Sequence, residues 1–277
     1  MSRPCAEESR PDVAPDGRVP LVTSTRYVTP LREGGSLPAV VEADDGELYV
    51  MKFRGAGQGA KALIAELVAG EIARILGLPV PDIAFMELNG RMGRSEPDPE
   101  IQDLLRQSEG INLGLRYLPS AFTYNQLLRP SPDEALASLI VWFDAYVTNV
   151  DRTPRNVNML MWRNRMWLID HGAALYFHHD WAKYMERSRS PFPLIHQHVL
   201  LEHAGALDEA NGVGHKLLTE EQLGEIVDLI PGSWLGDEPA FETCQEHRRA
   251  YLDYLLSRLE ASSSFVEEAK HARNKLI

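Results

Sequence analysis

The residues with the clearest chemical potential lie in the segment 149–156, Asn-Val-Asp-Arg-Thr-Pro-Arg-Asn. Asp151 and Asn156 both carry oxygen ligands of the kind that Mg²⁺ prefers, and Pro154 stiffens the loop that holds them. A carboxylate on such a loop can also orient an attacking hydroxyl group. The spacing of Asp151 and Asn156 is that of the D-x-x-x-x-N loops that transfer phosphoryl groups.

A predicted β-hairpin brings a further carboxylate to this loop. The apolar segments 157–162 and 165–170 flank Arg163-Asn164, which predicts a short turn. Folding the two segments back places Asp170 opposite residues 156–158, and directly paired Cα atoms lie about 4.5–5.5 Å apart. We therefore expect Asn156 and Asp170 to share one metal ion.

A lysine that can hold phosphates is predicted upstream. Lys52 lies in the apolar strand segment YVMKF, residues 49–53, and resembles the strand lysine that pairs with α- and β-phosphates. Glu66, on the next predicted helix, is expected to orient this lysine. Glu71 on the same helix is an alternative partner.

Glycines before the first hairpin strand offer a second contact for phosphates. Gly34, Gly35 and Ser36 directly precede that strand. Backbone N–H groups in such a segment can bind phosphate oxygens. We predict that these three residues contribute to nucleotide binding.

The elements that must position these residues begin with strands and one helix. Strands are predicted where apolar and β-branched residues lie between turn residues. Asp44-Asp45-Gly46 predicts a hairpin turn between the first two, and Gly77 with Pro79 ends the helix. The predicted strands cover 37–43, 47–53, 83–88 and 111–118, and the predicted helix covers 61–76.

After residue 118 the pattern becomes mainly helical. Residues 131–134, Ser-Pro-Asp-Glu, are predicted as a capping box with proline at the first helical position. They open an apolar helix that extends to about Val147 and that we expect to be buried. Thr219 and Gln222 are predicted to cap a later helix, and another helix is expected over about 240–260.

This order of elements predicts the fold class α+β, with two lobes around a ligand-binding cleft. We expect a disordered tail over residues 1–20, because that segment is polar and proline-rich. An N-terminal lobe with an antiparallel sheet is predicted over 21–118. A mainly helical C-terminal lobe is predicted over 119–277.

Composition and charge exclude several classes of partner. The net charge of −12 disfavours a nucleic acid or an anionic membrane surface. No apolar run approaches the roughly 18–20 residues that span a bilayer. The chain has only two cysteines, Cys5 and Cys244, and this sparse use fits a reducing cytosol.

A competing motif occurs in residues 55–60, Gly-Ala-Gly-Gln-Gly-Ala, which fit the dinucleotide pattern G-x-G-x-x-A between a strand and a helix. The strand of that motif is parallel and buried on both faces. Here the preceding strand follows a tight turn at Gly46, which predicts an antiparallel partner, and it contains Lys52. We therefore interpret these glycines as a loop before the helix.

Several motifs together resemble the HipA-like kinase family. They are YVMKF, AELVAGEIARILGLPVP, NVDRTPRN and LIDHG, and the resemblance covers about residues 27–180. The segment NVDRTPRN is also similar to the catalytic loop of phosphoinositide kinases. The resemblance implies a protein-kinase-like fold.

The same resemblance implies roles for individual residues. Lys52 and Glu66 would form an ion pair, Asp151 would be the catalytic base, and Asn156 and Asp170 would hold Mg²⁺. The segment Arg116-Tyr117-Leu118 looks like the hinge that contacts adenine, so Arg116, Tyr117 and Leu118 are expected to bind the cofactor.

The resemblance also implies a function. We expect an ATP- and Mg²⁺-dependent kinase of the cytoplasm that phosphorylates serine or threonine of a protein. Kinases of this type are known as toxins of toxin–antitoxin pairs, so an antitoxin-like partner protein is expected. A small-molecule or lipid kinase and a non-catalytic nucleotide-binding module are the alternatives.

Overall fold

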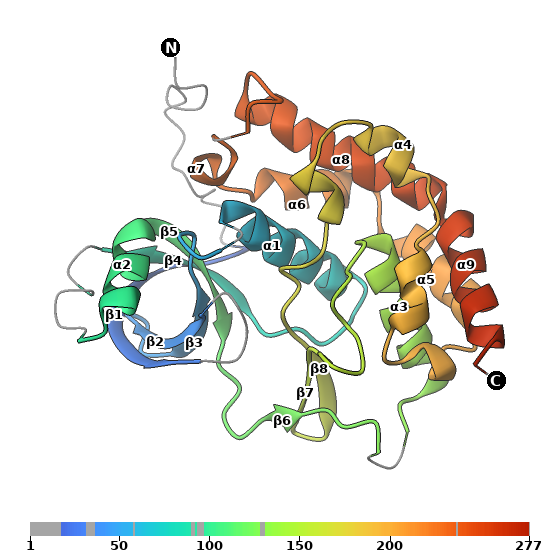
Figure 1. Ribbon diagram of the computed structural model, residues 1–277, viewed down its shortest axis with the longest axis horizontal. Helices are drawn as coiled ribbons and strands as arrows, with labels where there is room; N and C mark the ends of the chain where they lie inside the picture. The colour runs from blue at the N-terminus through green and yellow to red at the C-terminus, as the bar shows by residue number, and fades with distance from the viewer. Residues whose placement is uncertain are drawn as a thin grey trace.

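The structure is a computed structural model that describes residues 18–31, 37–57, 59–89, 92, 97–127, 131–236 and 238–276. A barrel of β-strands comes first, a mainly helical part follows, and helix α1 lies between the two (Figure 1). The sheet part and the helical part occur in the predicted order. Residues 1–17 of the predicted tail lie outside the described residues.

The barrel is closed, with strand order β1-β2-β3-β5-β4. Side chains such as Val41, Met51 and Phe53 form a hydrophobic cluster that belongs to these strands and to α2. A closed sheet has no unpaired edges, so every strand has two hydrogen-bonded neighbours. The strands are β1 (Leu21–Pro30), β2 (Ala39–Ala43), β3 (Leu48–Lys52), β4 (Ile83–Leu88) and β5 (Gly110–Arg116).

The prediction of a purely antiparallel sheet is wrong at one position. Strand β1, which was not predicted, pairs antiparallel with β2 but parallel with β4, where Leu21 lies opposite Phe85. This parallel pair closes the barrel. Turn residues reveal only strands that are neighbours along the chain, and β1 and β4 are separated by two other strands and a helix.

Strand β3 is antiparallel to both of its neighbours, β2 and β5. A dinucleotide-binding fold would require a parallel strand at this place. The glycines at 55, 57 and 59 therefore belong to a connecting loop, as the sequence indicated. Gly59 has a φ of 63°, which suits glycine at the residue that precedes α1.

Helix α1 (Ala60–Ile75) is buried along most of its length, including Glu66 and Glu71. It packs against β5 on one side and against α6 and α7 on the other. Gly77, with a φ of 75°, follows the end of the helix as predicted. Because α1 contacts both parts of the chain, any side chain on it has a fixed position relative to both.

The helical part begins with α3 (Glu134–Tyr146), which is buried through most of its length and ends shortly before the loop that starts at Asn149. Its cap is Asp133, whose side chain accepts the backbone N–H of Leu136, so the predicted box starting at Ser131 is two residues too early. The predicted capping box of Thr219 and Gln222 is present. The helices are α2 (Pro99–Gln107), α3 (Glu134–Tyr146), α4 (Tyr184–Ser188), α5 (Leu207–Leu217), α6 (Glu220–Asp228), α7 (Gly232–Leu235), α8 (Cys244–Glu260) and α9 (Ser262–Asn274), with 3₁₀ turns at Tyr176–His179, Pro193–Gln197 and Leu201–His203.

A small sheet lies below α1 in Figure 1 and consists of β6 (Phe122–Thr123), β7 (Met159–Trp162) and β8 (Arg165–Leu168). Strands β7 and β8 form the predicted hairpin, and both turn residues, Arg163 and Asn164, have positive φ. Two consecutive positive φ values are typical of the type I′ turn that suits a twisted hairpin.

Within the described ranges, none of the helices combines the length and the apolar character that a membrane span requires.

Helix α3 is held in place by α5, and this contact predicts opposite effects for two glycines. A methyl group on Gly214 would lie 2.2 Å from the Trp142 ring, whereas one on Gly212 would meet nothing within 4 Å. We expect Gly214→Ala to lose about 1–3 kcal/mol of unfolding free energy by overpacking. Gly212→Ala should gain about 0.5–1 kcal/mol, because alanine favours a helix.

Urea unfolding of the two single variants measures both effects. Equal stability of the two variants would contradict the packing described here.

Candidate active site

The centre of the candidate site is the ammonium group of Lys52. Its Nζ lies 2.5 Å from Glu66 Oε2 on α1 and within hydrogen-bond distance of Asp170 Oδ1, which follows β8. The Lys52 side chain is 10% exposed, that of Glu66 is fully buried, and that of Asp170 is 49% exposed. One ammonium therefore joins the barrel, α1 and the hairpin, and Asp170 is on the open side.

The structure answers which glutamate meets Lys52. Glu66 is the partner, whereas Glu71 forms ion pairs with Arg18 and Arg74 at 3.1 Å. Helical periodicity places Glu71 in the more apolar setting, but both glutamates are buried on α1, so an apolar setting does not identify the partner of Lys52.

The charges of these groups stabilise one another. Burial by itself lowers the pKa of Lys52, but the negative charges of Glu66 and Asp170 outweigh burial and raise it. Burial likewise favours the neutral form of Glu66, but Lys52 and a hydrogen bond from His171 hold its pKa well below the usual range. Both groups are therefore charged at neutral pH.

The loop that follows α3 carries Asp151 and Asn156. The Asn156 Nδ2 group donates to Asp151 Oδ2 at 2.6 Å, and the backbone groups of Thr153 and Asn156 hydrogen-bond each other. Burial raises the pKa of Asp151, the hydrogen bond from Asn156 opposes this, and the charge of Asp170 raises it further. The Asn158 Nδ2 group donates to the Asp151 backbone oxygen at 3.4 Å, and the Ile169 N–H group donates to the Asn158 oxygen at 3.1 Å, so the loop and the hairpin meet at this site.

The shape of this loop depends on a buried hub at Asp144 on α3, which the sequence analysis missed. Its fully buried carboxylate accepts hydrogen bonds from Arg152 Nε at 2.6 Å and from Asn149 Nδ2 at 2.8 Å, and it lies 2.8 Å from His198 Nε2. Arg152 also donates to the backbone oxygen of Asn158. Asp151 is thus fixed because its neighbour, Arg152, is anchored on both sides.

The Asp144 carboxyl group favours its charged form although it is buried. Burial raises the pKa of a carboxyl group, but the adjacent Arg152 and His198 outweigh burial and keep it far below the usual range. The signal in the sequence was the single acidic residue inside an otherwise apolar helix, WFDAY, next to a loop with arginine.

The hairpin determines the position of Asp170. Residue pairing in β7 and β8 ends with Met159 opposite Leu168, and the Ile169 N–H group then donates to the Asn158 oxygen at 3.1 Å. The regular pairing stops there, so Asp170 lies one residue beyond the contact of Ile169 with Asn158. Asp170 has a φ of 56°, so the chain bends there.

The oxygen atoms at this place suit a magnesium ion. Asn156 uses its amide nitrogen for Asp151, which leaves its amide oxygen as a ligand. Asp170 uses Oδ1 for Lys52 and is half exposed, so its second oxygen is available. Mg²⁺ is usually held by one or two such ligands together with phosphates and water.

A metal ion held by protein side chains alone would need several ligating residues close together. The described part of the chain contains no group of three or more His, Cys, Asp or Glu side chains arranged for a metal ion.

The predicted hinge follows β5. Arg116 pairs with Glu47, and the Tyr117 backbone N–H donates to the Leu48 oxygen at 2.8 Å. Tyr117 is partly exposed and Leu118 is buried. The hinge therefore runs antiparallel to β3 and joins the barrel to the helical part.

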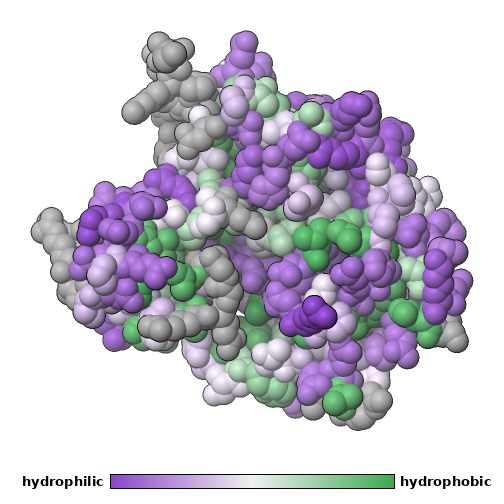
Figure 2. Space-filling model, viewed as in Figure 1, coloured by the Kyte–Doolittle hydropathy of each residue, from purple (hydrophilic) through white to green (hydrophobic). Residues whose placement is uncertain are grey.

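The structure does not describe every predicted contact residue, because Gly34, Gly35 and Ser36 lie outside the described residues. In Figure 2 the surface is hollowed between the barrel and the helical part, with hydrophilic residues along much of the rim.

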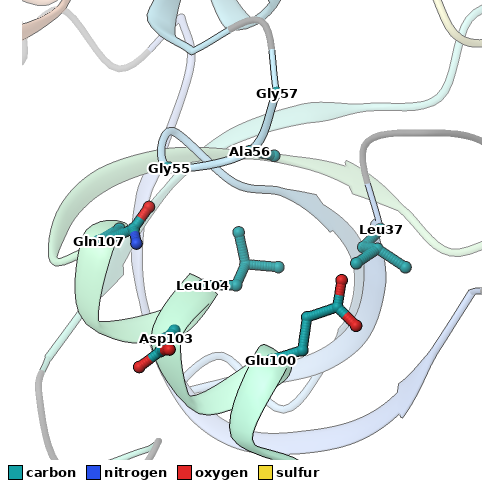
Figure 3. Close-up of a pocket in the computed structure, with 8 residues that line it drawn as sticks. All are labelled: Leu37, Gly55, Ala56, Gly57, Glu100, Asp103, Leu104 and Gln107. Atoms are coloured by element: carbon teal, nitrogen blue, oxygen red, sulfur yellow. The ribbon is translucent and has the colours of Figure 1, made fainter.

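A cavity of about 450 Å³ opens at one end of the barrel, beside α2. Figure 3 shows Leu104 pointing into it, with Leu37 opposite and the loop 55–57 along one side. Its lining includes Glu100, whose carboxylate would repel phosphates. Met51 and Phe53 face the cluster inside the barrel, so Lys52 between them points away from it. The cavity is therefore separate from the site at Lys52.

Comparisons with known proteins agree with this geometry. The profile of the HipA-like kinase family matches residues 25–268. A search among curated proteins finds no match. Among solved structures, the fold is similar to the crystal structure of CtkA, a Helicobacter pylori proinflammatory kinase. The TM-score is 0.54 at 13% sequence identity, over 93% of this chain and 99% of that chain.

Removal of the Arg152 guanidinium tests the buried hub. Arg152→Ala would leave the Asp144 carboxylate without its main counter-charge, and we expect a loss of about 3–5 kcal/mol of unfolding free energy. Arg155, on the same loop, is exposed. Arg155→Ala should therefore change stability by no more than about 0.5 kcal/mol. Chemical unfolding of both variants gives the comparison, and similar losses in both would show that the hub does not hold this loop.

Proposed function

The chain belongs to the HipA-like kinase family, and on this basis we propose that it is an ATP- and Mg²⁺-dependent phosphotransferase that phosphorylates serine or threonine of a protein. One observation carries the proposal: Lys52 is held by Glu66 and Asp170, and the hairpin that ends in Asp170 is hydrogen-bonded to the loop of Asp151 and Asn156. These groups come from four separate parts of the chain. Their convergence supplies a phosphate clamp, metal ligands and a carboxylate for the acceptor, which phosphoryl transfer requires.

We propose a two-lobed, protein-kinase-like arrangement. Residues 21–118 would form the N-terminal lobe and residues 119–277 the C-terminal lobe, with ATP between them. The hollow between the barrel and the helical part in Figure 2 and the shared fold with a kinase support this division.

In this proposal Lys52 binds the α- and β-phosphates, and Glu66 keeps its ammonium group oriented. Asn156 and Asp170 would hold Mg²⁺, which would supply positive charge against the phosphates. Carboxylates outnumber the lysine at this site, so a divalent cation also relieves their mutual repulsion. Asp170 would exchange part of its contact with Lys52 for contact with the metal ion.

Asp151 would orient the acceptor hydroxyl and receive its proton. Its raised pKa favours this role, because a carboxylate that binds a proton more tightly is the better base. The hydrogen bond from Asn156 fixes the direction of the carboxylate. Arg152, which is bonded to Asp144 and to the Asn158 oxygen, holds the backbone next to Asp151.

The hinge would bind the adenine ring. Tyr117 already donates its backbone N–H to Leu48, and no partner of the Leu118 N–H occurs among the described residues. The Leu118 amide is therefore the donor that we assign to adenine, and Arg116 and Tyr117 would flank the ring. Gly34, Gly35 and Ser36 remain proposed phosphate contacts.

The acceptor and the cellular setting are proposed from the family. We propose a protein acceptor in the cytoplasm, with an antitoxin-like protein as a further partner. The net charge of −12 argues against direct binding of nucleic acid or of an anionic membrane. A small-molecule or lipid acceptor, or nucleotide binding without transfer, are the outcomes that the experiments below separate.

Binding of ATP should require both Mg²⁺ and the carboxylate of Asp170. We expect Asp170→Asn to weaken ATP binding in the presence of Mg²⁺ by about tenfold or more, because a metal ligand loses its charge. Without Mg²⁺ the variant and the wild type should differ much less. Calorimetric titration in the four combinations measures this, and equal affinity in all four would refute the metal assignment.

Removal of Asp151 should abolish transfer and leave ATP binding largely intact, because this residue acts on the acceptor. The measurement uses labelled ATP, Mg²⁺ and a cell lysate, with wild type and Asp151→Ala side by side. Serine or threonine sites labelled only by the wild type support the proposal. A labelled lipid or metabolite in their place would make the acceptor assignment wrong, and ATP binding without any labelled product would favour the non-catalytic module.

A further inference from the structure

His171 follows the proposed metal ligand Asp170 directly, and the function proposed above gives its side chain no role. Protein kinases have phenylalanine at the corresponding place of their D-F-G motif. The His171 side chain is 2% exposed, and its ring packs edge-on against Phe143 with centroids 5.7 Å apart. Phenylalanine would therefore fit the same packing, and the nitrogen atoms of His171 call for another explanation.

Those nitrogen atoms face Glu66. The His171 backbone N–H donates to Glu66 Oε2 at 2.8 Å, and its ring Nδ1 lies 3.3 Å from Glu66 Oε1. Lys52 also binds Oε2. Among the described residues, only the ring Nδ1 of His171 contacts Oε1, so one oxygen of a fully buried carboxylate depends on this imidazole.

The contact between His171 Nδ1 and Glu66 Oε1 matters because the Glu66 carboxylate is buried. An ionised carboxylate without hydrogen-bond partners in the interior is costly, and its oxygens will turn toward any donor within reach. A proton on His171 Nδ1 fixes Oε1, which leaves Oε2 directed at Lys52. The Nε2 atom is buried without a partner among the described residues, so Glu66 is the polar contact that this ring makes there.

We propose that His171 is a positioning residue that holds the Glu66 carboxylate on Lys52 for phosphoryl transfer, an inference that rests on the proposed function. Asp170 and His171 are consecutive, so one rigid segment sets both the metal ligand and the orientation of the phosphate-binding lysine. In this chain the position occupied by phenylalanine in D-F-G takes part in the polar network.

Three variants separate this role from simple packing. His171→Phe keeps the ring against Phe143 and the backbone N–H but removes the bond to Oε1. His171→Asn places an amide N–H near the position of Nδ1 and should restore the bond. His247→Phe is the matched control, because His247 is also 2% exposed, and its ring stacks on Tyr251 at 5.3 Å, away from Lys52.

The first readout is ADP formation from ATP and Mg²⁺, measured with thermal stability on the same samples. We expect His171→Phe to lower kcat/KM for ATP by about 10- to 100-fold, and His171→Asn to recover most of that loss. His247→Phe should keep kcat/KM within about twofold of the wild type even if its stability falls. Unchanged kcat/KM in folded His171→Phe, or no recovery in folded His171→Asn, would overturn the inference.

A second readout does not require activity. Urea unfolding is measured for His171→Phe, Glu66→Ala and the double variant. If His171 acts through Glu66, His171→Phe lowers stability in the wild-type background and has little further effect after Glu66→Ala. Equal losses in both backgrounds would overturn the inference. A wild type that forms no ADP would instead refute the proposed function, and the contact between His171 and Glu66 would still be decided by this cycle.

Discussion

The burial of one ammonium group is the constraint on which the rest of this structure depends. Lys52 is almost completely removed from water, so its charge must be matched by carboxylates held in place by the fold. Glu66 supplies one from α1 and Asp170 supplies the other from the end of the hairpin. The barrel, the helix and the hairpin therefore have to meet at this point, whichever acceptor the protein phosphorylates.

A second buried charge organises the neighbouring loop in the same way. Asp144 and Arg152 are both fully buried, and their ion pair leaves the exposed residues of the loop free for chemistry. The ion pairs at Lys52 and at Asp144 differ in how far solvent reaches them. At Lys52 the half-exposed Asp170 leaves the site open to solvent, as the proposed binding of phosphates and metal requires. At Asp144 nothing is open to solvent, which suits a purely structural anchor.

Much of the fold follows from local chemistry. Four features occur as predicted: the DDG turn, helix α1, the hairpin at Arg163-Asn164 and the Thr219 cap. Each of them depends on residues only a few positions apart. Apart from the cap of α3, which is Asp133 and not Ser131, the errors concern contacts between distant segments. Strand β1 closes the barrel through a parallel pair with β4, and no local pattern indicates such a partner. Asp144 and His198 meet across more than fifty residues, which spacing cannot reveal.

The sequence by itself determined the types of chemical group and their order along the chain: a strand lysine, an acidic helix, an Asp-Asn loop and a hairpin that ends in Asp170. It favoured Glu66 as the partner of Lys52 but kept Glu71 as an alternative, because both lie on apolar parts of one helix. The tertiary structure decided between them, since the packing of α1 directs Glu66 to Lys52 and Glu71 to Arg18 and Arg74. It also placed His171 against Glu66. A buried charge takes the partner that the packed backbone brings within reach, and this distance exists only after folding.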